Sequence, residues 1–374
     1  MHVSRVSLRD FRNYERAELE LGDAVTVVCG ANGAGKTNLL EALYFGCAGR
    51  SCRTSNEREL VRRSAVAARV TVETVAEHES HLLEVAFEPG EPKRLRVDGA
   101  QVDRLVPGGA RPPVSVFMPE RLELVKGAPA PRRAHLDQVI AVLWPSRAAS
   151  RVAYARALAQ RNALLARVRA GAAGAVSLDT WDRELARCGI ELMADRREVA
   201  ELLAPLFARR ADELGLPADA ALGYRPRSGA TDDSELAAEL AARREADLDR
   251  GFTSHGPHRD EVQLLHGEEA LRTYGSQGQQ RTALLALLFA ERDLLLERSG
   301  SAPLMLLDDV MSELDAARRE RLAGALARCG QAVVTTTDAA YVPGAGESGS
   351  ILVQVESGDV CSATPSLRPR AVPA

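Results

Sequence analysis

The residues best suited to chemistry lie between positions 24 and 41, where a glycine-rich loop joins an apolar segment to a helix-forming one. The stretch from Gly30 to Thr37 matches the pattern G-x-x-x-x-G-K-[ST] without a mismatch. Glycines let a backbone wrap around a polyphosphate, and the amides of the loop and of the following helix then point at the anion. A buried strand is predicted at 24–29 and a helix at 38–43, which is the context that this motif requires. The predicted nucleotide-binding residues are Gly30, Ala31, Asn32, Gly33, Ala34, Gly35, Lys36 and Thr37.

Two side chains of this loop are candidates for the chemistry itself. Lys36 is expected to reach the β- and γ-phosphates and is the first predicted catalytic residue, and Thr37 is expected to offer its hydroxyl to Mg²⁺. Only three of the 48 basic residues are lysines, so Lys36 marks a position where arginine does not substitute. The motif predicts a bound nucleoside triphosphate, with ATP and Mg²⁺ as the expected cofactors. It does not say what the nucleotide is for.

A pair of acids, Asp308 and Asp309, follows four apolar residues at 304–307. A buried strand that ends in acids delivers a carboxylate to the Mg²⁺ region, which is the Walker B arrangement. Asp308 is therefore a predicted metal residue together with Thr37, and Asp309 is the second predicted catalytic residue. Such ATPases usually carry a glutamate at the position of Asp309 to polarise the attacking water, so the shorter side chain predicts slow hydrolysis. Thr37 and Asp308 lie far apart in the sequence, and the residues between them must leave the sheet and return.

Residues 274–281 form a loop of serine, glycine and glutamine before a strongly helical segment, 282–297. Ser276 is well placed to cap this helix, and Gly278 permits a close backbone approach. The loop resembles a second anion-binding site. In ATP-binding-cassette (ABC) proteins this position holds the signature motif, which binds the γ-phosphate of ATP held by the opposite subunit. The similarity implies a head-to-tail dimer with two shared ATPs, in which the nucleotide also meets Ser276, Gly278 and Gln279.

The remaining pattern predicts the elements that position these groups. Alternating residues predict two strands within 2–21 and an antiparallel β layer at 66–98. Residues 131–250 are almost free of strand patterns and rich in Ala, Leu, Arg and Glu, which predicts a helical domain inserted between two halves of the nucleotide site. Further expected elements are a short helix at 57–63, strands at 114–117 and 332–336, and a turn at 312–315.

The predicted fold is an α/β P-loop NTPase of the ABC-ATPase/SMC head type, with an antiparallel β layer and an inserted helical domain. Four segments are expected. They are residues 1–125, the first half of the ATPase domain with the P-loop; 126–250, the inserted helical domain; 251–360, the second half with the signature and Walker B residues; and 361–374, a disordered tail with three prolines.

Residues 131–170 carry eight arginines against a single acid, Asp137. Two interpretations of this stretch are open. The arginine stems can flank a packed leucine stripe, because Leu158 and Leu165 fall on the same side of a helix as several arginines. Alternatively, the arginines face the phosphates of a nucleic acid.

Composition excludes several classes of protein. A hydrophobic content of 45% and a charged content of 27% are those of an ordinary soluble protein, and no stretch approaches the ~18–20 apolar residues of a membrane span. The N-terminus lacks the apolar region of a signal peptide. Six scattered cysteines without a C-x-x-C pair argue against a zinc or disulfide framework, and His255, His258 and His266 lack convincing metal-ligand spacing. A cytoplasmic protein with no membrane partner is expected.

The motifs together resemble those of the RecF family of bacterial recombination mediators, which are SMC-like ABC ATPases. The resemblance covers nearly the whole chain except the tail beyond residue 360. It departs from the family pattern at Arg121, where the family usually has Asp, and in the helix after the signature, which lacks a lysine that many members carry. The matching segments are 8–14, 30–38, 53–55, 119–122, 132–137, 160–165, 256–260, 276–281, 306–315 and 335–338.

This resemblance implies a DNA-repair protein that dimerises with ATP on double-stranded or gapped DNA, including single-strand/double-strand junctions. It implies that the chain is primarily a DNA-binding mediator with weak, DNA-dependent ATPase activity. The implied partners are RecR, RecO and the RecA system, whose recombinase the protein helps to load on DNA in replication-gap repair and SOS induction.

Two other functions are alternatives to this one. The first is an ATPase subunit of a transporter. The long helical insert, the missing Leu-Ser-Gly-Gly-Gln signature and Thr337 at the usual position of a switch histidine argue against it. The second is a P-loop phosphotransferase for small molecules, which would leave the loop at Ser276 unexplained.

Overall fold

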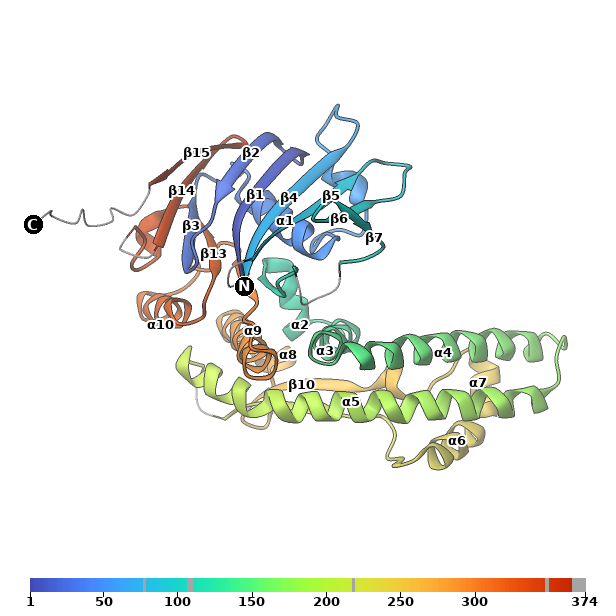
Figure 1. Cartoon of the computed structure of the whole chain (residues 1–374). Coiled ribbons are helices and arrows are strands. Elements are labelled where there is room, and N and C mark those ends of the chain that lie inside the picture. Colours follow the sequence, from blue (N-terminus) through green and yellow to red (C-terminus); the bar gives the residue numbers. More distant parts are fainter. Residues whose placement is uncertain (77–78, 106–109, 217–218, 347–349, 365–374) are drawn as a thin grey trace, which may run out of the picture. The chain divides into compact units, whose positions relative to one another are not determined.

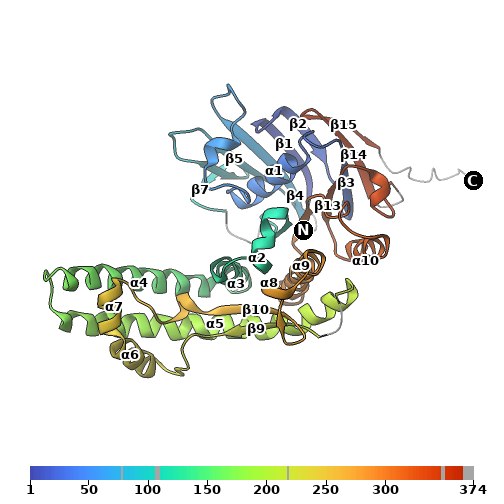
Figure 2. The same ribbon diagram turned by 180° about the vertical axis from the view of Figure 1, so that it is seen from behind.

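The computed structural model describes residues 1–76, 79–105, 110–216, 219–346 and 350–364 (Figure 1). The chain forms two compact units, each built from segments that are separated in the sequence. The first unit contains Met1–Arg121, Glu213–Gly215 and Leu295–Ala374, and the second contains Leu122–Asp212 and Leu216–Leu294. Figure 2 shows the elements of each unit from behind.

The first unit contains an antiparallel sheet of six strands in the order β2-β1-β4-β5-β6-β7. Its strands are β1 (His2–Phe11), β2 (Tyr14–Glu20), β4 (Ala68–Ala76), β5 (Glu79–Phe87), β6 (Arg94–Val97) and β7 (Ala100–Val102). Buried and more exposed residues alternate along β1, β2 and β4, because one face of the sheet packs on the core and the other faces solvent. The two strands predicted within 2–21 and the antiparallel layer predicted at 66–98 are both confirmed.

The second sheet of this unit has the order β15-β14-β3-β13-β12-β8, and all its neighbours pair in parallel except β14 and β15. Its strands are β3 (Val25–Cys29), β8 (Val114–Phe117), β12 (Leu304–Leu307), β13 (Ala332–Thr336), β14 (Ser350–Glu356) and β15 (Asp359–Thr364). The strands predicted before the glycine-rich loop, at 114–117 and at 332–336 are confirmed. Because β3 and β12 both pair in parallel with β13, their C-terminal ends lie at the same edge of the sheet.

Helix α1 (Lys36–Ala48) packs against strands of both sheets. Every residue from Leu39 to Cys47 is buried, which suits a helix covered on two sides. Gly46 allows the close approach of α1 to β4, since a Cβ at this position would lie 2.4 Å from a methyl group of Val72. The first turn of α1 is therefore fixed by a rigid layer on each side of the helix.

The second unit is mainly helical, as the sequence predicts for 131–250. Helices α4 (Ala148–Arg169) and α5 (Leu178–Glu213) run side by side in both views, and Tyr154 of α4 shares an apolar core with Leu185 and Leu192 of α5. Other helices of the chain are α2 (Glu123–Lys126), α3 (Pro129–Leu143), α6 (Asp233–Ala242), α7 (Arg244–Arg250), α8 (Leu271–Tyr274), α9 (Gln277–Ser299) and α10 (Ala316–Ala327).

Six short 3₁₀ helices complete the described elements. They are η1 (Glu57–Leu60), η2 (Pro119–Leu122), η3 (Pro145–Arg147), η4 (Ala175–Ser177), η5 (Pro257–Arg259) and η6 (Ala339–Tyr341). The helix predicted at 57–63 is therefore shorter than expected. Its continuation is prevented because Val61 has extended geometry and forms a β-bridge with Phe11.

A three-stranded antiparallel sheet, β11-β10-β9, belongs to the second unit. Its strands are β9 (Ala220–Arg225), β10 (Glu261–His266) and β11 (Glu269–Ala270). Strand β9 is not predicted by the sequence pattern, because its alanines and glycine have weak strand propensity and its partner β10 lies far along the chain. This pairing holds residues 251–294 in the second unit, whereas the sequence analysis placed 251–360 in one segment and ended the helical domain at 250.

Ion pairs also connect the later part of the second unit to its helices. They are Arg132–Glu261, Arg196–Asp260 and Arg210–Asp293, with N···O distances of 2.8, 3.6 and 2.6 Å. The arginine of each pair lies on α3 or α5, and two of the acids lie on β10 and α9. These contacts explain why the compact unit extends to Leu294.

Most arginines of the basic stretch 131–170 are bound within the protein. Those with a hydrogen-bond or ion-pair partner are Arg132, Arg133, Arg147, Arg151 and Arg161. Arg156, Arg167 and Arg169 are exposed and form no ion pair with any described residue. Packing within the protein is therefore the better interpretation for the majority, and only the remaining three are candidates for an external anion.

The prediction of a disordered tail at 361–374 is wrong for residues 361–364, which belong to β15. Residues 365–374 lie outside the described part of the chain. The five cysteines that the structure describes are all free thiols. Among the described helices, none is both long enough and apolar enough to cross a membrane.

Arg161→Met is expected to lower the free energy of unfolding by about 3–5 kcal/mol, because it leaves the fully buried Asp247 without its cation. Arg161 has no exposed side-chain surface and donates to Asp182, Asp247 and Thr253 at 2.6–2.7 Å. Chemical denaturation measures the loss. Arg156→Met, on the exposed face of the same helix, is the control and should change stability by less than about 0.5 kcal/mol. Equal losses in the two variants would contradict this role of Arg161.

Candidate functional site

The glycine-rich loop connects the end of β3 to the start of α1. Gly33 and Gly35 have φ angles of 82° and 120°, a region that residues with a Cβ rarely adopt. Gly30 is required for a different reason, since a Cβ there would lie 2.3 Å from the carbonyl oxygen of Val355 on β14. The residues at 31–33 are exposed, and those at 34–36 are buried. The loop thus presents its outer half to solvent and is anchored at its inner half.

Three residues outside the motif hold the carbonyl groups of the loop. Asn13 Nδ2 donates to the carbonyl oxygen of Ala34 at 3.2 Å, and the backbone amide of Gly358 donates to the same oxygen at 2.9 Å. Tyr14 Oη donates to the carbonyl oxygen of Gly35 at 3.0 Å. The site analysis from sequence did not select these residues. The available signal was the segment 8–14, which entered only as part of the family resemblance.

Lys36 lies under the loop with 7% of its surface exposed. Its Nζ donates to the carbonyl oxygens of Gly30 and Ala31 at 2.7 and 3.0 Å, and it forms no ion pair with a described residue. A buried ammonium group without a counter-ion is unfavourable, so the site favours a bound anion. The N-terminus of α1 has the same preference, because Gly35 precedes the helix and no described side chain caps it.

Asp308 follows β12 and meets the first turn of α1. Thr37 Oγ1 lies 2.8 Å from Oδ2 and 3.0 Å from Oδ1 of Asp308, although 271 positions separate the two residues. Thr335 of β13 donates its hydroxyl to Oδ1 at 2.7 Å. Burial raises the pKa of Asp308 above its ordinary value, and the hydroxyl donors oppose this effect only in part. The structure therefore brings together the hydroxyl and the carboxylate predicted for one Mg²⁺.

Asp309 has an unusual backbone conformation, with φ at 46°. Aspartate is tolerated in this left-handed region better than most residues, which is a physical reason for Asp where a longer acid was expected. Its amide donates to Thr335 Oγ1 at 2.9 Å, and its Oδ1 is buried without a hydrogen-bond partner among the described residues. An orphaned acceptor of this kind suits a water molecule or a bound ligand.

A buried acid on α1, Glu41, fixes the helix from behind the loop. Arg12 binds both of its carboxylate oxygens at 2.9 Å, and Ser51 and Arg53 bind them as well. Arg53 also donates to Asn38 Oδ1 at 3.1 Å. These residues connect the loop helix to the turns before β2 and after α1. Sequence reasoning did not identify this cluster as part of the site.

The loop at Ser276 lies in the second unit and begins α9. Ser276 Oγ accepts a hydrogen bond from the amide of Gln279 at 3.2 Å, and the amide of Ser276 donates to Gln279 Oε1 at 2.7 Å. This reciprocal pair is a capping box, so the predicted N-cap is confirmed. The carbonyl oxygen of Gly278 accepts from Thr282 Oγ1 at 2.9 Å. Ser276 is exposed.

Comparison with known proteins identifies the lineage of the chain. A family model described as "AAA domain" matches residues 5–111. The DNA replication and repair protein RecF of Streptomyces avermitilis is 40% identical over 361 residues, covering 92% of this chain and 95% of that protein. The RecF protein of Myxococcus xanthus is 39% identical over 373 residues, covering 96% and 97%.

The chain belongs to the RecF family. The structure titled "recombination mediator protein RecF-ATP in RecFOR pathway" has a TM-score of 0.84 and 28% identity, covering 97% of both chains. An Smc head bound to the C-winged helix domain of ScpA has a TM-score of 0.58 and 15% identity over 97% of this chain and 98% of that chain, and this likeness concerns the fold alone. The predicted fold class, a P-loop ATPase of the ABC/SMC head type, is confirmed. Membership of the RecF family gives no support to a transporter subunit.

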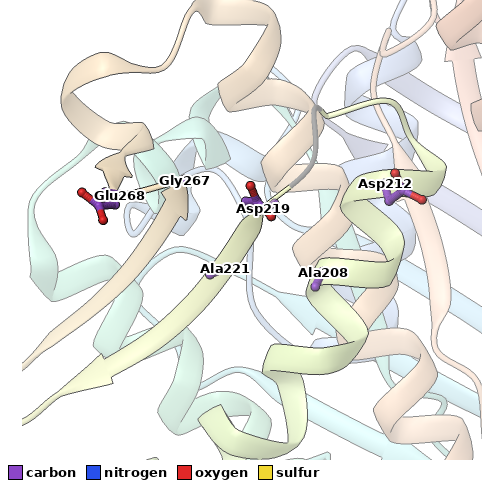
Figure 3. Close-up of a pocket in the computed structure, with 7 residues that line it drawn as sticks. Ala208, Asp212, Asp219, Ala221, Gly267 and Glu268 are labelled. Atoms are coloured by element: carbon purple, nitrogen blue, oxygen red, sulfur yellow. The ribbon is translucent and has the colours of Figure 1, made fainter.

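A separate hollow in the second unit of this RecF-family chain is a poor place for a nucleotide. It has a volume of about 630 Å³ and is lined by Ala208, Asp212, Asp219, Ala220, Ala221, Gly267 and Glu268 (Figure 3). Three of these residues are acids, and none of the described residues lining the hollow is basic. Its charge would repel a polyphosphate, so this hollow is not a candidate for the nucleotide site.

Asp308→Asn is expected to remove the stabilisation by MgATP without destabilising the protein alone. A carboxyl group whose pKa is raised on folding costs stability once the pH exceeds its unfolded pKa, so its neutral replacement keeps or raises the melting temperature at pH 7. Wild-type protein should gain about 2.7 kcal/mol from ligand at 100 times its Kd. Thermal unfolding with and without MgATP measures both effects.

Asp309→Asn is the matched control for this experiment. Asparagine also tolerates a positive φ, so this variant should retain the stabilisation by MgATP. Undiminished stabilisation of Asp308→Asn by MgATP would contradict the assignment of Asp308 to the metal.

Proposed function

We propose that this RecF-family chain is an ATP-dependent DNA-binding protein that acts in recombinational repair of replication gaps. The contact between Thr37 and Asp308 carries this proposal, because it places a hydroxyl and a carboxylate suited to Mg²⁺ next to the glycine-rich loop, although 271 positions separate the two residues. The supporting kinship is to proteins named for DNA replication and repair, and to solved structures titled as RecF with ATP in the RecFOR pathway.

The residues from Gly30 to Thr37 bind the phosphates in this proposal. Loop amides and the N-terminus of α1 supply dipoles, and Lys36 exchanges its carbonyl partners for phosphate oxygens. Thr37 and Asp308 would hold Mg²⁺, which when bound neutralises charge on the phosphates. Gly30, Ala31, Asn32, Gly33, Ala34 and Gly35 shape the loop, and Asn13 and Tyr14 keep its inner half in place.

Asp309 is the residue that we assign to hydrolysis. Its buried, unpartnered Oδ1 can accept a hydrogen bond from a water molecule. The side chain is one methylene shorter than that of glutamate, so the acceptor has a shorter reach and hydrolysis is slow. A slow ATPase suits a protein that uses ATP to stay assembled more than to perform repeated work.

Dimerisation is proposed to bring the loop at Ser276 of one copy to the ATP of another. The capping box leaves the Ser276 hydroxyl exposed at the positive end of α9, where Gly278 and Gln279 can also approach phosphate oxygens. Each copy then contributes a P-loop to one ATP and the loop at Ser276 to the other. The assembly is a head-to-tail dimer that depends on nucleotide.

The proposed partners follow from the same kinship. DNA, either duplex or with a gap, is the substrate on which the dimer closes, and RecR and RecO are expected to act with it. We extend the proposal to loading of RecA, to support of SOS induction and to a cytoplasmic location, where the DNA and these partners are found.

Lys36→Met is expected to abolish ATP-dependent binding to gapped duplex DNA, because a protein that does not hold ATP does not dimerise. Fluorescence anisotropy of labelled DNA measures binding. Wild-type protein with MgATP should lose about 10³–10⁵ in affinity between about 50 and 200 mM salt if it contacts about 6–10 phosphates. Lys126→Met, an exposed lysine of the second unit, is the control and should bind nearly as wild type does. Full binding by Lys36→Met, or a flat salt dependence of the wild type, would refute the mechanism.

Ser276→Arg is expected to abolish ATP-dependent dimers while leaving ATP binding nearly intact, because Ser276 meets only the nucleotide of the partner. Sedimentation with and without MgATP reports the dimer, and nucleotide binding is measured at concentrations where the protein is monomeric. Ser299→Arg, at the exposed opposite end of α9, should dimerise normally. Dimers of Ser276→Arg with MgATP would show that this loop does not act across the interface.

A further inference from the structure

The exposed face of the antiparallel sheet in the first unit carries a row of arginines across its strands. Arg9 of β1 lies opposite Arg16 of β2 on one side and Arg69 of β4 on the other. The same row continues through Ala86 of β5 to Arg94 of β6. Directly paired residues project from the same face of a sheet, and all four arginines are exposed. These strands lie side by side in Figure 1.

Three of the four arginines have no acidic partner among the described residues: Arg9, Arg69 and Arg94. The fourth, Arg16, lies 3.2 Å from Glu18 of its own strand. The other rows of this face are different. Two positions along β2 from the row lies the exposed acid Glu18, and two positions along β5 lies the half-buried acid Glu84. Further along β1, Arg5 pairs with Glu20 at 2.9 Å and with Glu73 at 4.0 Å.

Such a row is unfavourable for the sheet alone. Like charges directly opposite on neighbouring strands repel, and Arg9 is flanked by an arginine on each side. The rest of the same face shows that this sheet pairs arginine with acid where only stability is required. An external anion that lies along the row would relieve the repulsion.

A hollow of about 540 Å³ borders the row. The charged residues that line it are Arg9, Asp10, Arg62, Arg69, Glu88 and Arg94. Asp10 is occupied by Arg62, with an Oδ1···Nε distance of 2.8 Å, and Arg62 also lies 3.5 Å from Glu15. Among the described residues that line the hollow, Glu88 is therefore the one other acid, whereas the row contributes three unpaired arginines, Arg9, Arg69 and Arg94. The local balance of charge is therefore positive, although the whole chain has a net charge of −4.

The dimensions of the row suit a nucleic-acid backbone. Neighbouring strands are about 4.8 Å apart, so the row from β2 to β6 spans roughly 19 Å. Duplex DNA carries one negative charge per about 1.7 Å of its axis, which places several phosphates within this length. Long guanidinium side chains on the exposed face of a sheet can meet these phosphates without reading base edges.

We propose that the arginine row Arg9, Arg16, Arg69 and Arg94 is a binding surface for the phosphate backbone of duplex DNA. This inference rests on the proposed DNA-binding function and specifies the surface that performs it. The contact is independent of sequence, because guanidinium groups on phosphates carry no base information. It also assigns a role to arginines outside the basic stretch at 131–170. Most arginines within that stretch have hydrogen-bond or ion-pair partners inside the protein.

The test is the salt dependence of binding by a triple variant, Arg9→Gln/Arg69→Gln/Arg94→Gln. Anisotropy of a labelled blunt duplex is measured with MgATP at several salt concentrations. Each lost phosphate contact reduces the slope of log K against log[salt] by about 0.9, so the triple variant should lose about 2.7. A fourfold rise in salt should then weaken its binding about 40-fold less than it weakens that of the wild type.

Arg5→Gln is the matched control, because Arg5 lies on the same strand and the same face but is paired with acids. It should leave the slope unchanged. The triple variant should bind MgATP as the wild type does, and its melting temperature should be equal or higher, since the removed charges repel one another. A lower melting temperature together with an unchanged slope would mean that the row is structural and would overturn the proposal.

The outcomes separate this inference from the proposed function. If wild type and triple variant bind DNA with the same slope, the function stands and the surface is wrong. If Arg5→Gln lowers the slope as much as each residue of the row does, the effect is one of general charge and the surface is again wrong. If the wild type does not bind duplex DNA with MgATP, the proposed function and this surface both fail.

Discussion

The hydrogen bonds between Thr37 and Asp308 are the interaction on which the candidate site depends. They join residues from the two ends of the chain, and they form only because β3 and β12 both flank β13 in a parallel sheet. Thr335 lies on β13, the strand between β3 and β12. Its hydroxyl donates to Asp308 and accepts from the amide of Asp309. One central strand therefore sets the positions of the hydroxyl and of both acids.

The sequence was most informative where chemistry is encoded locally. The glycine-rich loop and the apolar strand before Asp308 are short patterns, and the strands and helix around them were predicted correctly. Asn13 and Tyr14 were not predicted as site residues, because they donate hydrogen bonds to backbone carbonyl oxygens of the loop. Such backbone contacts cannot be read from the pattern of side chains. Strand β9 was not predicted because its partner strand is distant along the chain. Strand β14 could have been predicted, because its residues alternate and a turn follows at Gly358.

Composition gave little information on which charged side chains are exposed and which are paired within the protein. The count of arginines at 131–170 left packing within the protein and an exposed basic surface both open, and Arg161 is among the most deeply buried side chains in the protein. Long-range acids such as Asp247 decide which arginines are neutralised, and no local pattern reveals them. On the antiparallel sheet, in contrast, exposed arginines that are distant in the sequence are brought together. Arg9 and Arg69 become neighbours only through strand register. Removing one partner of a buried pair such as Arg161 and Asp247 leaves the other charge uncompensated.

The position of Gly358 near the C-terminal end determines when the glycine-rich loop can be anchored during synthesis of the chain. Its amide holds the loop carbonyl of Ala34, and β14 just before it pairs with β3 while its Val355 oxygen packs on Gly30. A chain on the ribosome thus carries the glycine-rich loop from early in synthesis but cannot anchor it until residue 358 has emerged. A chain cut before residue 358 lacks the Gly358 amide that holds the carbonyl oxygen of Ala34, although it still contains every residue of the glycine-rich loop.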